Sequence, residues 1–279
     1  RHMNIGSAKI RREEMHGIPH HMIDILEPWE SFHVAYFKQR SLECMAEIYE
    51  RKHIPIITGG TGFYIQALLR DVDFTDEQED REYRERLEKL ADEHGEEYLH
   101  DRLKEVDPAA ADEIHANNKK RIIRALEFYH LTGRCISEHN RLERQKESAY
   151  NSCYFVLNDD RDKLYARIDQ RVDEMLAEGL VDEVRRLKEM GCHRGMVSMQ
   201  GLGYKEILAW LDGEITYEEA VETLKRDTRH FAKRQLTWFR REKDVIWINK
   251  NDFGRDEGRI LEFILERLAV AQIKAITPQ

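Results

Sequence analysis

The sequence contains no hydrophobic run long enough to cross a membrane. Charged residues interrupt every apolar stretch before the roughly 18 residues that a membrane helix needs, and the start of the chain is too polar for a signal peptide. Glycine and proline are also scarce, at 15 and 5 of 279 residues, which excludes a collagen-like or disordered chain. With 41% hydrophobic and 35% charged residues, the chain is predicted to be a globular, cytoplasmic protein.

Cysteine is scarce as well, and the four cysteines are Cys44, Cys135, Cys153 and Cys192. Because no two of them form a C-x-x-C pair, we predict reduced structural thiols rather than a disulfide framework or a metal site. The adjacent histidines His20 and His21 are a weak metal motif, since neighbouring side chains on an extended segment point to opposite sides. We therefore predict no metal ligand in this chain.

Basic residues are not in excess either. Lys and Arg number 45 against 54 Asp and Glu, a formal net charge of −9, which by itself argues against a nucleic-acid partner. One segment reverses this balance, because residues 225–243 contain eight Lys or Arg against only Asp227 and Glu242. The local sign matters more than the total, since a phosphate is felt over about 8 Å in physiological salt.

This basic segment belongs to a predicted long helix over residues 217–242. Its polar and basic side chains recur at three- and four-residue intervals, which places them on one face. The members of this face are Arg226, Arg229, Lys233, Thr237, Arg240 and Arg241. Two interpretations stay open: a surface that binds a polyanion, or a solvated face paired with acidic residues elsewhere.

The N-terminal third alternates strand and helix. Residues 21–25 and 54–57 are predicted strands, and residues 33–52 between them form a predicted helix. This alternation predicts a parallel sheet. From 75 to 148 the sequence contains only charged helical segments, which predicts an all-helical insertion.

After the insertion, the alternation of strands and helices returns. The further predicted elements are a strand at 152–157, a helix ending at Gly179, helices at 180–190 and 201–211, the basic helix, and a last strand at 245–249. The predicted fold class is therefore α/β. Its core comprises residues 1–74 and 149–279, and residues 75–148 form a helical insertion domain.

Two glycine-rich turns and one basic cluster carry the remaining signals. The stretch IPIITGGTGFYIQ, residues 54–66, is a strand–glycine–helix turn of the kind that approaches an anion, but no lysine follows its glycines. The stretch MQGLGYKE, residues 199–206, has Lys205 one turn into a helix. It either brings the backbone close to a nucleotide or is a simple loop-to-helix transition. The basic cluster KKRIIR, residues 119–124, opens a helix of the insertion.

Taken in order, these stretches resemble the tRNA dimethylallyltransferases, also called tRNA isopentenyltransferases. The match runs nearly from end to end of the chain. The matching segments are RHMNIGSAK at 1–9, GIPHHMID at 17–24, GGTGFY at 59–64, NNKKRIIRALE at 117–127, GLGYK at 201–205 and KRQLTWFR at 233–240.

The resemblance implies a P-loop NTPase-like parallel sheet core flanked by helices. Relatives begin with a strand, a P-loop of the form G-x-T-x-x-G-K-[ST] and a D-S-x-Q-x-Y segment. These hold the diphosphate with Mg²⁺ and supply the aspartate proposed as general base. None of these motifs is in this sequence, so we expect them upstream of Arg1, and Mg²⁺ is the expected cofactor.

The implied reaction transfers a dimethylallyl group from dimethylallyl diphosphate to N6 of the adenosine immediately 3′ of the anticodon in tRNA, giving N6-isopentenyladenosine. The implied partners are dimethylallyl diphosphate and the tRNA anticodon stem-loop, and we expect a monomer that acts without a membrane. Two alternatives stay open: a P-loop small-molecule kinase, which shares the core architecture, and a non-catalytic RNA-binding protein.

The resemblance also implies roles for individual residues. Thr61 is expected to line the channel beside the flipped base, and Lys205, where many relatives carry arginine, to contact nucleotide or diphosphate. The residues expected to bind tRNA are Thr61, Arg84, Lys120, Arg121, Arg124, Gln200, Gly201, Gly203, Tyr204, Lys205, Lys233, Arg234, Gln235, Thr237, Trp238 and Arg240. We predict that the insertion contacts the anticodon stem, and that a cationic cleft between core and insertion receives it.

Overall fold

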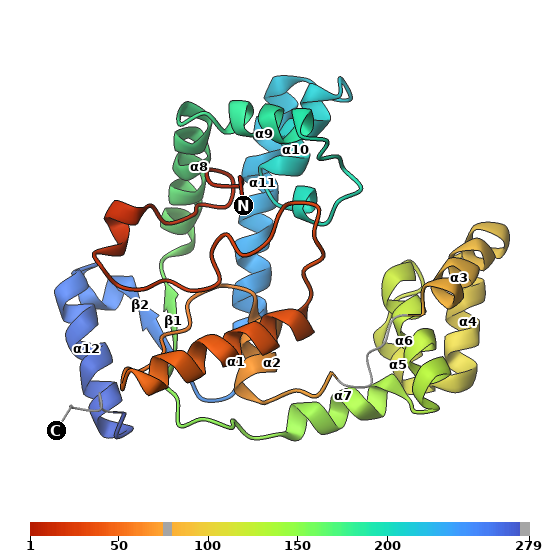
Figure 1. The fold of residues 1–279 in the computed structure, drawn as a ribbon, viewed down its shortest axis with the longest axis horizontal. Helices are drawn as coiled ribbons and strands as arrows, with labels where there is room; N and C mark the ends of the chain where they lie inside the picture. Colours follow the sequence, from red (N-terminus) through yellow and green to blue (C-terminus); the bar gives the residue numbers. More distant parts are fainter. Residues whose placement is uncertain (75–79, 274–279) are drawn as a thin grey trace. The chain divides into compact units, whose positions relative to one another are not determined.

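The computed structural model describes residues 1–74 and 80–273. Contacts between residues divide the chain into two units (Figure 1). Unit 1 comprises Arg1–Ile65 and Asn151–Gln279, and unit 2 comprises Gln66–Tyr150. Unit 2 therefore begins earlier and ends slightly later than the predicted insertion of residues 75–148, whose residues 75–79 lie outside the described part of the chain.

Unit 1 contains both strands and most of the long helices. In chain order its elements are the 3₁₀ turn η1 (Arg12–Met15), α1 (Val34–Glu50), the start of α2 (Gly62–Leu69), β1 (Tyr154–Asn158), α8 (Arg161–Ala177), α9 (Leu180–Glu189), η2 (Ser198–Gln200), α10 (Tyr204–Leu211), α11 (Tyr217–Phe239), β2 (Val245–Asn249), η3 (Lys250–Phe253) and α12 (Glu257–Val270). The predicted helices and the predicted strands at 152–157 and 245–249 are confirmed; α12 lies beyond them.

The sheet of unit 1 is parallel. Strands β1 and β2 pair in register from Tyr154 opposite Val245 to Asn158 opposite Asn249. They are the only paired strands in the described residues, so the α/β class with parallel pairing is confirmed in this reduced form.

The predicted strands at 21–25 and 54–57 are wrong. Met22 and Asp24 have φ angles of 63° and 55°, and a left-handed residue breaks an extended strand. Residues 54–57 find no neighbouring strand among the described residues, so no ladder forms, and the Ile56 side chain is 84% exposed.

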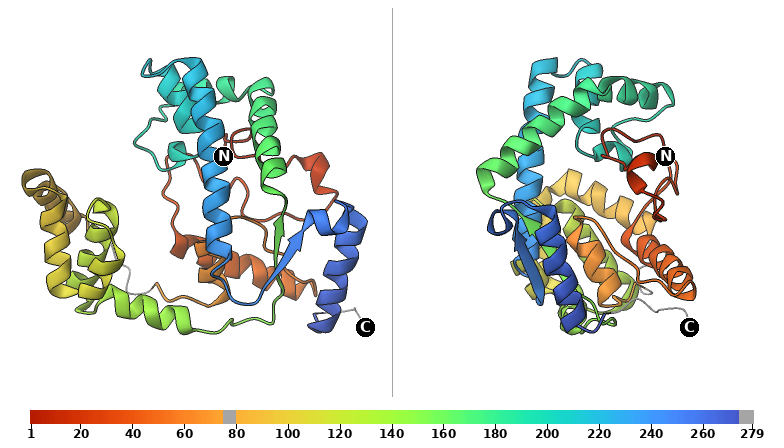
Figure 2. Two further views of the ribbon diagram at one scale, coloured as in Figure 1. Left: turned by 180° about the vertical axis from the view of Figure 1, so that it is seen from behind. Right: turned by 90° about the vertical axis from the view of Figure 1, so that its left-hand side faces the viewer.

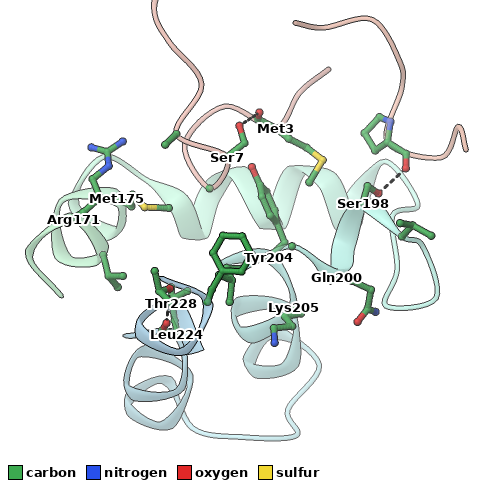
Figure 3. Close-up of a pocket in the computed structure, with 18 of the residues that line it drawn as sticks. Met3, Ser7, Arg171, Met175, Ser198, Gln200, Tyr204, Lys205, Leu224 and Thr228 are labelled. Carbon is green, nitrogen blue, oxygen red and sulfur yellow. Dashed lines mark hydrogen bonds between the residues drawn. The ribbon is translucent and has the colours of Figure 1, made fainter. Parts of the chain in front are cut away.

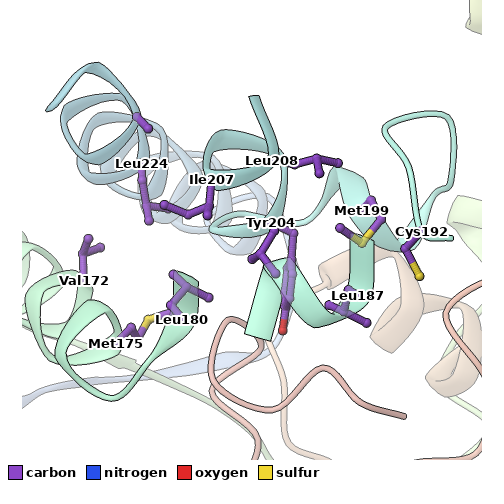
Figure 4. Packing of buried hydrophobic residues seen from close by; sticks show 12 residues of the cluster. Val172, Met175, Leu180, Leu187, Cys192, Met199, Tyr204, Ile207, Leu208 and Leu224 are labelled. Carbon is purple, nitrogen blue, oxygen red and sulfur yellow. The ribbon is translucent and has the colours of Figure 1, made fainter. Parts of the chain in front are cut away.

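The main core of unit 1 lies where α8, α9, α10 and α11 meet (Figure 4). Leu180, Leu187, Ile207 and Leu208 are buried there almost completely, and each such side chain contributes roughly 1.5–3 kcal/mol by leaving water. Gly179, with a φ of 103°, allows the chain to turn sharply between α8 and α9. Helices α8 and α11 run side by side (Figure 2).

Helices are the only regular elements in the described residues of unit 2. Its helices after α2 are α3 (Arg81–His94), α4 (Glu96–Val106), α5 (Pro108–Glu113), α6 (Lys119–Thr132) and α7 (Ile136–Gln145). They enclose a core that includes Leu87, Leu99, Leu103 and Ile122. Across both units, no described helix is both long enough and apolar enough to span a bilayer.

Candidate functional site

Unit 1 contains a cavity of about 1330 Å³. Its walls come from the N-terminal segment, residues 22–32, α8, the turn before α10, and α11. The close-up in Figure 3 shows Gln200, Tyr204 and Lys205 on the α10 side and Arg171 on α8. Of the residues predicted to bind tRNA, the cavity gathers Gln200, Gly201, Tyr204, Lys205 and Arg234.

One wall of the cavity is the N-terminal loop of residues 3–9. The loop is a compact turn, closed by backbone bonds from Ala8 N to Ile5 O and from Lys9 N to Asn4 O. The Ser7 hydroxyl donates to Met3 O at 2.6 Å, the bond drawn in Figure 3. Met3, Gly6, Ser7 and Ala8 all face the cavity.

Glu183 of α9 holds this loop, although the sequence analysis did not identify it. Its side chain is 2% exposed, and it accepts hydrogen bonds from the backbone N–H groups of Asn4, Ile5 and Gly6 at 2.9–3.2 Å. A signal was present in the sequence. Glu183 falls among Leu180, Val184 and Leu187, on the face of α9 that is buried, where a carboxylate needs partners.

Tyr204 lies beneath the same loop. It is 2% exposed, and its hydroxyl donates to Glu183 Oε1 at 2.8 Å. Burial, and then the bond to the Glu183 carboxylate, raise the pKa of Tyr204 well above the ordinary value, so the phenol stays protonated. Gly6 packs on the ring, because a Cβ there would lie 2.5 Å from Cζ of Tyr204. Tyr204 thus lines the cavity and is at the same time part of the hydrophobic core of unit 1.

Lys205 presents a cation to the cavity. Its ammonium lies 3.2 Å from Glu206 Oε1 and 3.2 Å from Asp227 Oδ2. Burial by itself lowers the pKa of Lys205, but the two carboxylates outweigh it and raise the pKa above the ordinary 10.5. Lys205 is therefore a fixed positive charge, and its side chain remains 34% exposed.

The basic helix α11 consists of two electrostatically different halves. In the first half, Lys225 pairs with Asp173 at 2.6 Å and Arg229 pairs with Asp169, both on α8. Arg226 pairs with Asp227 within α11 itself. The second half differs, because its cations are exposed and have no carboxylate partner among the described residues. These cations are Lys233 and Arg234 on α11, and Arg240, Arg241 and Lys243 just beyond its last residue, Phe239.

The GGTG turn is also packed against α11. The Gln235 amide donates to Gly60 O at 2.9 Å, and the Trp238 indole lies directly on Gly62. Thr61 has an exposed side chain, and its carbonyl accepts from Tyr64 N and Ile65 N to start α2. Thr61, Gln235 and Trp238 are thereby brought together. Gly60 and Gly62 leave the space that the Gln235 and Trp238 side chains of α11 occupy.

The predicted residues of unit 2 fall into two kinds. Arg84 binds the buried carboxylate of Glu127 through two nitrogens, at 2.7 and 2.8 Å, and Arg124 binds it at 3.1 Å. Lys120 and Arg121 are exposed on α6 and have no ion pair among the described residues. Of these four residues, only Lys120 and Arg121 have a charge that is wholly available to a ligand.

The described residues offer no metal centre. No three His, Cys, Asp or Glu side chains among them come together in a group that could hold an ion. The four cysteines are free thiols.

Comparison with known proteins gives a consistent result. The family model described as IPP transferase matches residues 1–242. The chain is 57% identical over 264 residues to a tRNA dimethylallyltransferase of Lachnoclostridium phytofermentans, covering 95% of this chain and 84% of the relative.

Two solved structures are similar. One is the full-length tRNA isopentenylpyrophosphate transferase from Bacillus halodurans, with a TM-score of 0.69 and 44% identity over 98% of this chain and 86% of that one. The other is a eukaryotic dimethylallyltransferase acting on tRNA, with a TM-score of 0.80 and 25% identity over 98% of this chain and 71% of that one.

Proposed function

Because the chain belongs to the IPP transferase family, we propose that it is an enzyme that transfers a dimethylallyl group from dimethylallyl diphosphate to tRNA. The observation that carries this function is the match to a tRNA dimethylallyltransferase at 57% identity over 95% of the chain. The geometry supports it, because the residues at the matching motifs of unit 1 cluster around one cavity and one helix. Neither the kinase nor the non-catalytic alternative is favoured.

The acceptor is N6 of the adenosine immediately 3′ of the anticodon. Its lone pair forms a bond to C1 of the dimethylallyl group while the bond from C1 to the diphosphate oxygen breaks, and N6 loses a proton. The exocyclic amine is a weak nucleophile, so orientation of the two substrates and stabilisation of the departing anion supply most of the acceleration. The adenine leaves its stack to reach the site, at a cost of a few kcal/mol.

The described residues include candidates for binding both the diphosphate and the acceptor tRNA. Lys205 stays protonated at the cavity, where it is paired with Glu206 and Asp227, and its exposed ammonium can also bind negative charge on nucleotide or diphosphate. We propose that Thr61, on the turn packed against α11, contacts the flipped base. The exposed cations on and just after α11, Lys233 and Arg240 among them, attract the tRNA backbone.

Further parts of the proposal concern the core and the cofactor. We place the two-stranded parallel sheet in a P-loop NTPase-like core. We also propose Mg²⁺ as the cofactor, held mainly by the substrate phosphates as is common for this ion, since the described residues contain no group of three or more possible ligands. We also propose that the protein is a monomer and that it is cytoplasmic, and the free thiols support the cytoplasmic location.

The test is transfer of label from radiolabelled dimethylallyl diphosphate to tRNA transcripts, followed by nuclease digestion. Label is expected in N6-isopentenyladenosine, and a transcript with guanosine 3′ of the anticodon should take up none. Label on that transcript would move the acceptor position. An enzyme that labels no tRNA, but phosphorylates a nucleoside from ATP, would replace the transferase with the kinase.

A further inference from the structure

Glu183 is the meeting point of three segments that are distant in sequence. It belongs to α9, its backbone donors Asn4, Ile5 and Gly6 belong to the N-terminal loop, and its side-chain donor Tyr204 begins α10. The loop's amides of residues 4–6 point at the carboxylate, while those of Ala8 and Lys9 close the turn on itself. The backbone of the loop is thus constrained from both sides.

The hydrogen bonds to Glu183 explain how its carboxylate is tolerated on the buried, apolar face of α9. A carboxylate that is 2% exposed is strongly unfavourable unless hydrogen bonds satisfy both oxygens. Here Oε1 receives the Tyr204 hydroxyl and backbone donors, and Oε2 receives backbone donors. Bonds to a charged acceptor are shorter and stronger than neutral ones, so the loop is held in one position.

The held loop is a wall of the cavity. Gly6 lies on the Tyr204 ring without room for a side chain, and Gly6, Ser7 and Met3 face the same space as Lys205. Figure 3 shows the Tyr204 ring directed from α10 toward the loop. A shift of the loop therefore changes the shape of the cavity without removing any of its charges.

We propose that Glu183 is a positioning residue for the transfer reaction, which fixes the wall of residues 3–9 at the distance from Lys205 that the substrates require. This rests on the proposed function. Because Lys9, the one cation of the wall, is already paired with Asp24, displacement of the wall should leave the attraction for tRNA unchanged. It should lower the turnover, because a misplacement of about 1 Å can cost about a hundredfold in rate.

Glu183→Gln tests this with little change of shape. The amide keeps one acceptor oxygen but turns an NH₂ group toward backbone donors. We expect kcat to fall between about tenfold and a hundredfold, with the KM for tRNA unchanged within about twofold. Hydrogen exchange of the amides of residues 4–6, followed by mass spectrometry, should become faster. Tyr204→Phe removes one donor and should have the same effects in smaller measure, which keeps the test usable if Glu183→Gln folds poorly.

The matched control is Asp159→Asn. Asp159 is another buried carboxylate of unit 1, bonded to Arg255 at 2.7 Å and to the Asp160 amide at 2.8 Å, and it does not line the cavity. It should lower thermal stability but leave kcat and loop exchange unchanged.

Unchanged exchange in Glu183→Gln would overturn the proposal, as would faster exchange with unchanged kcat, or equal losses of kcat in Asp159→Asn. A wild-type enzyme that transfers nothing to tRNA would instead overturn the proposed function and, with it, the catalytic consequence. The exchange data would still decide whether Glu183 holds the loop.

Discussion

Gly62 and Trp238 pack so closely that a Cβ atom on residue 62 would lie 2.1 Å from Cδ1 of the indole. The contact joins the turn that carries Thr61 to the last two turns of α11. The indole also touches the ring of Phe63, at 6.4 Å between centroids. Trp238, predicted to line a tRNA cleft, thus has a packing role in unit 1 as well.

Gly62→Ala should lower the free energy of unfolding by about 1–3 kcal/mol, because the new methyl group has no room and the indole must move. Gly60→Ala is the matched control. A Cβ there would meet the Gln235 amide nitrogen at 1.8 Å, but that atom is the end of a flexible side chain and can rotate away. Urea denaturation of both variants checks this, and equal losses would contradict the assignment.

Thr61→Ala should lower the single-turnover rate of transfer much more than the affinity for tRNA. The exposed side chain of Thr61 adds little to stability, while its carbonyl, which starts α2, is kept in the variant. Thr61→Ser retains the hydroxyl and should recover most of the rate. Rapid-quench measurement at saturating tRNA gives the rate, and a wild-type rate in Thr61→Ala would remove Thr61 from the reaction.

Arg240→Ala should weaken tRNA binding and lower the slope of log affinity against log salt by about one, because one phosphate contact is lost. Arg229→Ala, within α11, is the control, since Arg229 is already paired with Asp169, and its effect on the slope should be smaller. Filter binding across a salt series distinguishes them. Equal slopes in wild type and Arg240→Ala would take Arg240 out of the interface.

Lys205 should act as a charge and not as a proton acceptor. Its folded pKa is raised above 10.5, so it stays protonated below the ordinary value and loses its ion pairs only as the pH rises through the raised pKa. Lys205→Arg should therefore keep the shape of the rate–pH profile from about pH 6 to about pH 9, whereas Lys205→Met should lower the rate throughout. A profile limb that disappears in Lys205→Arg would show that Lys205 titrates during turnover.

Glu127→Gln should destabilise unit 2, on the order of 3 kcal/mol, because it removes the charge of a buried carboxylate that binds both Arg84 and Arg124. The exposed Glu85 of α3 provides the control, and Glu85→Gln should change the stability by less than about 0.5 kcal/mol. Thermal unfolding of both variants is the measurement. A Glu127→Gln protein as stable as wild type would mean that the two arginines do not depend on this carboxylate.

Local elements followed from local pattern. The apolar spacing of α1, α8 and α9 and the glycine at the end of α8 predict those helices, because a helix is stabilised by bonds between residues four apart and by caps within its own sequence. The motifs likewise indicated the family from the sequence alone. The predicted strand at 54–57 failed for the opposite reason, since a strand exists only where a second segment completes its hydrogen bonds.

The sequence by itself therefore determined the helices, the glycine turns, the family and the residues worth testing. Only the tertiary structure decided which cations are paired with a carboxylate and which are not. Arg229 and Asp169 are 60 residues apart in the sequence, and Asn4 and Glu183 are 179 apart. Neither pairing can therefore be predicted from the spacing of residues within one helix or strand. Arg229 on the basic face of α11 is paired with a carboxylate of α8, whereas Lys233 on the same face has no carboxylate partner among the described residues. A single buried glutamate holds the loop beside the cavity. Both depend on which segments the fold brings together, because Coulomb and hydrogen-bond energies depend on distance in space.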